Sequence, residues 1–139
     1  MMMMLMNGRT EQRVAGVELA TTRVERRRGL LGRNAIDPGS ALVLAPCCSI
    51  HTAFMRFAID VIFVDGDGRV VRIAKRVVPW RIVIAPGAYA AIELAAGSIG
   101  SHAVELDDCL YVQSGDGATG AAPSFRGSLS FRRLAAPAA

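Results

Sequence analysis

The chain has 139 residues, which suits a single domain, and its 52% hydrophobic content allows a real core. Its net charge is +4, and 15 of its 16 basic residues are arginines, but these form no long face with interleaved aromatics, which disfavours nucleic-acid binding. No stretch reaches the roughly 20 apolar residues of a membrane span, and three cysteines are too few for a secreted disulfide scaffold. The composition therefore predicts a soluble domain of the cytoplasm.

Composition divides the chain into three parts. Residues 1–13 begin with a methionine run and then turn polar, which predicts a disordered N-terminus. Residues 14–113 carry the alternating and apolar patterns of one β-rich domain. From Ser114 to Ala139, 17 of 26 residues are Gly, Ala, Ser or Pro, which is typical of a disordered tail.

The first half of the domain is predicted to contain two strands around one helix. A loosely alternating strand covers 14–20. Thr22-Arg23-Val24-Glu25 is a capping box, which predicts a helix over about 22–32 with Gly32 as its left-handed final residue. An apolar run at 41–45 then predicts a short buried strand.

The second half reads as short strands joined by turns. Alternation fails across 50–65, which predicts two elements with a break near Ala58. Asp65-Gly66-Asp67-Gly68 predicts a hairpin turn, and a return strand follows over 69–78. The remaining strands are expected at 82–84, 89–94 and 109–112, with a helical turn within 95–102. The predicted fold class is α+β, mostly antiparallel β, as a small barrel or a sandwich-like structure.

Three motifs within 50–65 carry a family resemblance. Ile50-His51-Thr52, Met55-Arg56-Phe57 and Ile59-Asp60-Val61 resemble an uncharacterised bacterial family, domain of unknown function 192. Further segments in the family order are Arg26, Gly29-Leu30-Leu31-Gly32-Arg33, Asp67-Gly68-Arg69-Val70-Val71, Pro79-Trp80-Arg81, Ile92-Glu93-Leu94 and Ala96-Gly97. The resemblance covers about residues 14–113, with departures such as Ala58 at a usual proline. It implies a compact, mostly antiparallel β-structure with one short helix and brings no known activity.

The candidate ligand-binding residues cluster around these motifs. His51 can bind a ligand or a proton, and Trp80 can supply a stacking wall. Arg56 and Asp60 should not be buried unpaired among apolar neighbours, so they form either an internal ion pair or the polar floor of a small pocket. The full candidate set is His51, Met55, Arg56, Asp60, Trp80 and Arg33.

Metal and nucleophile chemistry are disfavoured. Cys48 and His51 have a zinc-like spacing, but a structural zinc site needs four ligands, and only Cys109 and His102 remain. Cys47 or Cys48 with His51 as base would require the chain to bend. We therefore expect neither a metal site nor a cofactor.

Three functional hypotheses remain open. The first is a small binding module for a polar ligand or a protein segment, which is not an enzyme. The second is a hydrolase-type enzyme that uses His51 with Asp60 or a cysteine. The third is a structural or assembly factor that makes contacts through the tail at 114–139. Sequence alone does not identify the ligand, the partner or the oligomeric state.

Overall fold

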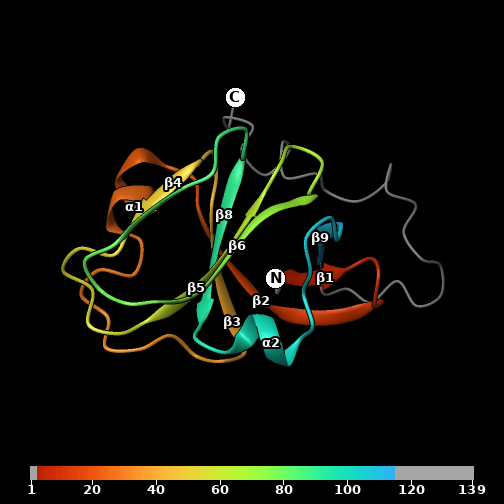
Figure 1. The fold of residues 1–139 in the computed structure, drawn as a ribbon, viewed down its shortest axis with the longest axis horizontal. Coiled ribbons are helices and arrows are strands. Elements are labelled where there is room, and N and C mark those ends of the chain that lie inside the picture. The colour runs from red at the N-terminus through yellow and green to blue at the C-terminus, as the bar shows by residue number, and fades with distance from the viewer. Residues whose placement is uncertain (1–2, 115–139) are drawn as a thin grey trace.

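The computed structural model describes residues 3–114, which form one seven-stranded sheet, one two-stranded ribbon and two short helices (Figure 1). In the large sheet the strand order is β6-β5-β8-β3-β2-β1-β9, and only the β2–β3 pair is parallel. These strands are β1 (Met3–Asn7), β2 (Gln12–Ala20), β3 (Ser40–Leu44), β5 (Ile59–Val64), β6 (Val70–Val77), β8 (Ala90–Ala95) and β9 (Leu110–Ser114). The ribbon pairs β4 (Ser49–His51) with β7 (Ile82–Ile84), and the helices are α1 (Arg23–Arg28) and α2 (Ser98–Ser101).

The predicted mostly antiparallel β-fold is confirmed, and the large sheet curls into a half-barrel (Figure 1). The break predicted near Ala58 separates β4 from β5. The predicted hairpin turn joins β5 to β6, where the Gly68 amide donates to the Asp65 carbonyl at 3.0 Å. The Asp65 carboxylate also accepts bonds from the amides of Asp67 and Arg69 at 2.9 and 3.0 Å, which is the turn chemistry that aspartate favours.

The helix predicted over 22–32 is shorter in the structure, where α1 covers only Arg23–Arg28. Its start is as predicted, because the Thr22 hydroxyl accepts a hydrogen bond from the Glu25 amide at 3.1 Å. Its end comes four residues early because Gly29 leaves helical geometry, with φ 45° and ψ −124°. Gly32 has the expected positive φ of 82° but lies in the following turn.

The domain begins at residue 3 rather than at residue 14, which corrects the predicted disordered N-terminus over the described residues. Strand β1 lies between β2 and β9, and Leu5 and Asn7 within it are fully buried. The Asn7 side-chain amide donates to Asp108 Oδ2 at 2.9 Å, and Arg9 Nε donates to Asp108 Oδ1 at 2.6 Å. The part of the methionine run that the structure describes, Met3–Met6, therefore lies in an apolar strand that pairs with a strand on each side. Of the tail predicted from residue 114, all but the first residue lies outside the described residues.

Buried side chains form a core on each face of the large sheet. In the β5–β8 pair, Ile62 lies opposite Ile92, and both belong to the first core. Val61 and Phe63 point to the other face and belong to the second core. Ile50 of β4 and Val83 of β7, which are register partners, pack into this second core as well. The ribbon and the turn after α1 therefore cover one face of the sheet.

Among the residues described, no helix has the length and apolar character needed to cross a membrane.

Candidate functional site

A cavity of about 70 Å³ opens between α1 and β4, on the face of the sheet that the second core covers. Its lining comes from α1 and the turn after it, from β4, from the loop residues Cys47 and Met55, from Leu44 of β3 and from Glu93 of β8. Glu93 is the one acidic residue in this lining. We call this feature the Glu93 cavity.

Glu93 is deeply buried because its strand lies inside the sheet. It is paired with Val61 of β5 on one side and Leu42 of β3 on the other, and its exposed fraction is 4%. Its Oε2 atom makes no hydrogen bond. Buried polar groups in proteins are nearly always hydrogen-bonded, so this unpartnered oxygen on a residue that lines the cavity calls for an explanation.

Burial raises the pKa of Glu93 from 4.5 to about 7, and the positive charge of Arg33 opposes this rise. The raised value follows from the cost of holding a negative charge away from water. Near neutral pH the carboxyl group therefore exists in both the protonated and the ionised form. It can accept a proton from a ligand or donate one to it.

Polarity changes from the interior of the Glu93 cavity to its mouth. Leu30, Leu44, Ile50 and Met55 line it and are buried. The more exposed lining residues are polar or basic, and they are Arg27, Arg28, Ser49 and His51. A ligand in this cavity would meet a carboxyl group and apolar walls inside, and positive charge at the mouth.

The backbone conformation of Gly29 lets the chain turn beside the carboxyl group of Glu93. A methyl group added at Gly29 would make only ordinary contacts, 3.9 Å from Glu93 Oε2 and 4.0 Å from the Leu44 side chain. The positive φ of 45° is what disfavours any residue with a side chain at this position. The short helix and its early end are therefore part of what shapes the cavity.

Cys47 lines the cavity as a protonated thiol. Its Sγ donates to the Ser49 carbonyl at 3.0 Å. Burial raises the pKa of Cys47, and the Ser49 contact only partly opposes this. Since a thiolate is the reactive form of cysteine, this environment disfavours Cys47 as a nucleophile.

A second cavity of about 320 Å³ lies beside the first and shares Arg28 and Gly29 with it. Its lining includes Arg33, which forms a two-pronged ion pair with Glu18 at 2.7 and 3.1 Å. Arg33 thus lies outside the Glu93 cavity and acts on Glu93 only through its charge.

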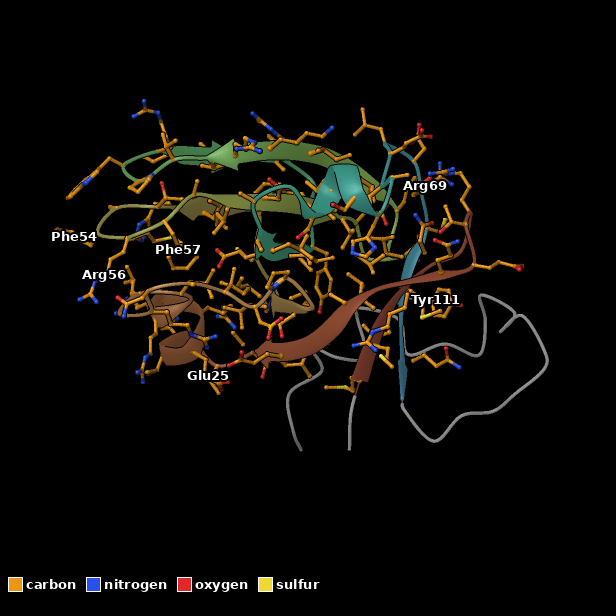
Figure 2. The ribbon with its side chains drawn as sticks, turned by 90° about the horizontal axis from the view of Figure 1, so that it is seen from below. Glu25, Phe54, Arg56, Phe57, Arg69 and Tyr111 are labelled. Atoms are coloured by element: carbon orange, nitrogen blue, oxygen red, sulfur yellow. The ribbon has the colours of Figure 1, made fainter. Side chains whose placement is uncertain are left out.

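The structure places two of the six predicted site residues, His51 and Met55, in the Glu93 cavity. Arg56 is exposed and donates to Asn34 Oδ1 at 2.7 Å. Trp80 is 61% exposed and packs edge-on against Phe54, with 4.6 Å between ring centroids. Figure 2 shows Phe54, Arg56 and Phe57 at one end of the molecule, in the same half as Glu25 of α1, with Tyr111 of β9 in the other half.

The expected ion pair between Arg56 and Asp60 does not form. Asp60 is fully buried on the opposite face of the sheet from Glu93. Its carboxylate accepts bonds from the amides of Arg76, Gly97 and Ile99 at 2.9, 3.0 and 3.0 Å. The Arg76 contact holds a residue with a positive φ of 50° where the β5–β6 register shifts. Asp60 therefore joins a strand bulge to the start of α2.

Sequence reasoning missed Glu93 as a site residue. It appeared only as the middle of Ile92-Glu93-Leu94, one of the segments carrying the family resemblance. A usable signal was present, because Glu93 is the one charged residue between Tyr89 and Gly97. An acid inside a run that reads as a buried strand is costly unless it has a partner or a function.

The described part of the chain holds no group of three or more His, Cys, Asp or Glu side chains arranged to bind a metal ion. Cys47, Cys48 and Cys109 are free.

Comparisons with solved structures show the same fold in two bacterial proteins. One, from Sinorhizobium meliloti, is described as a "putative transcription regulator"; it is 21% identical, with a TM-score of 0.69 over 78% of this chain and 90% of that chain. The other, from Novosphingobium aromaticivorans, is described as a protein of unknown function; it is 24% identical, with a TM-score of 0.68 over 78% and 82% of the two chains. A search of curated proteins found no match.

Family models give a consistent result. The model of DUF192, described as an uncharacterized ACR, matches residues 4–112. That range includes four of the five residues of β1 and three of the five residues of β9, so it reaches both of these strands. The chain therefore belongs to the DUF192 family, a domain family of unknown function.

Proposed function

We propose that this protein is a small binding module and that the Glu93 cavity is its ligand site. The observation that carries the proposal is the buried carboxyl group of Glu93, which lines the cavity and whose Oε2 atom makes no hydrogen bond. A ligand that donates a hydrogen bond there would remove the cost of leaving this atom unpaired, about 1–3 kcal/mol for a typical buried polar group.

The remaining lining residues are suited to the selective binding of a small molecule. Buried Ile50 and Met55 provide apolar contact, and exposed His51 is a polar group near the mouth. A concave site that combines apolar walls with polar groups able to orient a ligand is suited to small-molecule binding. Arg33 contributes by tuning the charge on Glu93, whereas Arg56, Asp60 and Trp80 stand outside the cavity in this proposal.

The test is a screen of small polar fragments against ¹⁵N-labelled protein. We expect hits to shift the amide signals of Ile50, His51 and Met55, and we expect the Glu93→Gln variant to weaken those hits at least about tenfold, which is 1.4 kcal/mol. Glu105→Gln is the matched control, because Glu105 is an exposed acid far from the cavity in sequence. The proposal fails if the hits shift other regions, or if both variants bind them equally well.

A second candidate is acid–base catalysis in the same cavity. The pKa of Glu93, about 7, lies in the range that suits a general acid or base, and His51 lines the same cavity. In this version Glu93 takes the place that Asp60 had in the sequence hypothesis. The two candidates differ in the fate of the ligand. If a bound fragment is recovered chemically unchanged after long incubation, the binding module is supported. If the fragment is converted and Glu93→Gln abolishes the conversion, the enzyme is supported.

The proposed compartment is the cytoplasm. Free Cys47, Cys48 and Cys109 support it, because thiols persist in a reducing environment. Fractionation of cells that express a tagged chain tests this, and recovery in a membrane or extracellular fraction would contradict it.

A further inference from the structure

Opposite charges at the two ends of the Glu93 cavity indicate what kind of ligand it takes. The carboxyl group of Glu93 is inside, with an exposed fraction of 4%. Arg27 and Arg28 also line the cavity, and both residues are exposed. Apolar side chains, including Leu44 and Met55, complete the lining. The cavity thus offers a negative group, an apolar wall and positive groups.

Within the described residues, Glu93, Arg27 and Arg28 form no ion pair. The ion pairs there involve only Arg9 and Arg33 among the arginines, so Arg27 and Arg28 remain free to bind an anion. Glu93 Oε2 likewise makes no hydrogen bond. A buried carboxylate is stabilised by a cation or a donor at hydrogen-bond distance, and guanidinium groups suit carboxylate or phosphate.

Resting on the proposed function, we infer that the ligand is a small zwitterion, bound with its amine at Glu93 and its carboxylate or phosphate at Arg27 and Arg28. A short carbon chain between the two groups would lie against the apolar lining. The cavity volume of about 70 Å³ gives room for about five water-sized groups. This suits short amino acids and phosphoethanolamine, and it is too small for a nucleotide or an oligosaccharide.

Ligands with a single charge fit this arrangement less well. A simple anion would satisfy the arginines and leave Glu93 unpartnered. A simple amine would pair with Glu93 but would add positive charge to a cavity that already contains Arg27 and Arg28. Only a ligand with both groups meets both ends of the site.

The experiment compares matched ligands by calorimetry at pH 8. γ-Aminobutyrate and O-phosphoethanolamine are the zwitterions, butyrate lacks the amine, and butylamine lacks the acid. We expect at least one zwitterion to bind at least about tenfold more tightly than both single-charge analogues, and comparing the two zwitterions distinguishes carboxylate from phosphate. Single-charge analogues that bind as tightly as the zwitterions would overturn the inference, and so would an absence of zwitterion binding at millimolar concentration.

Two variants test which residues bind each end of the ligand. Glu93→Gln should remove the advantage of a zwitterion over butyrate, and the double variant Arg27→Ala/Arg28→Ala should remove its advantage over butylamine. Glu105→Gln should keep both advantages. If the variants weaken all ligands equally, the assignment of the ends is wrong.

These outcomes are separable from the proposed function. Failure of every zwitterion, with neutral polar fragments still binding at Ile50 and His51 in a Glu93-dependent manner, would overturn only the zwitterion inference. Loss of all cavity binding would overturn both.

Discussion

Asp60 and Glu93 lie on adjacent strands one register step apart, and their buried carboxyl groups point to opposite faces of the same sheet. Val61, the neighbour of Asp60, is the partner of Glu93. Asp60 accepts three backbone hydrogen bonds, whereas Glu93 has an oxygen with none. The first carboxylate therefore stabilises the fold, whereas the second leaves a buried oxygen unpartnered, which costs stability.

Glu93 should make the fold less stable as pH rises. Its folded pKa of about 7 lies above the ordinary 4.5, so between these values the folded state binds more protons than the unfolded state, and stability falls with rising pH. The full effect is about 3 kcal/mol. Urea unfolding at pH 5, 6, 7 and 8 should show the decline in wild type and a flatter profile in Glu93→Gln. Parallel profiles for the two proteins would contradict this assignment.

Replacing Asp60 should damage the fold far more than replacing Arg56. Asp60→Ala leaves the amides of Arg76, Gly97 and Ile99 without their acceptor, at an expected cost of about 3 kcal/mol or more. Arg56→Ala removes one exposed contact to Asn34 and should cost less than about 0.5 kcal/mol. Urea midpoints measure both, and equal losses would restore the idea of an Arg56–Asp60 pair.

The first strand should be essential for folding. Deleting residues 2–8 removes β1 from between β2 and β9 and leaves Asp108 without Asn7. We expect a chain without the cooperative unfolding transition of the wild type, measured by circular dichroism. Leu5→Ala is the milder variant, and loss of this fully buried side chain should cost about 2–5 kcal/mol. A deletion variant with the wild-type midpoint would show that the domain starts near residue 14.

The fluorescence of Trp80 should be that of a solvent-exposed tryptophan and should not respond to binding in the cavity. It is the only tryptophan of the chain and is 61% exposed, so its fluorescence should resemble that of tryptophan in water and be quenched readily by acrylamide. Phe54→Ala removes its edge-on partner and should increase quenching further. Strongly blue-shifted emission, or a large shift on ligand binding, would place Trp80 in the site after all.

Local chemistry explains which elements the sequence could predict. The Asp65–Gly68 turn and the start of α1 at Thr22 depend on side chains that bond to nearby backbone, so they can be read from a few residues. The break between β4 and β5 follows from a failed alternation near Ala58. The position of β1 could not be read in this way, because its partners are β2 and the distant β9.

The lining of the proposed site was only partly predictable for the same reason. His51 and Met55 belong to one recognisable segment and do line the cavity. Glu93 is placed there by pairing with β3 and β5 on its two sides, which no local pattern encodes. Asp60 and Arg56 are close in sequence, but they have different environments. Asp60 lies at the start of β5 and is buried, whereas Arg56 lies before the strand and is exposed to solvent.

The pairing of β1 with β9 also fixes how the domain can be connected to other molecules. Met3 and Ser114 are register partners, so the first and last of the described residues lie side by side. Figure 2 shows Tyr111 of β9 in the opposite half of the molecule from Glu25 of α1, the helix beside the cavity. A host protein joined at Met3 and Ser114 would therefore be attached next to β9, in the half of the molecule away from α1, and its two halves would stay close together.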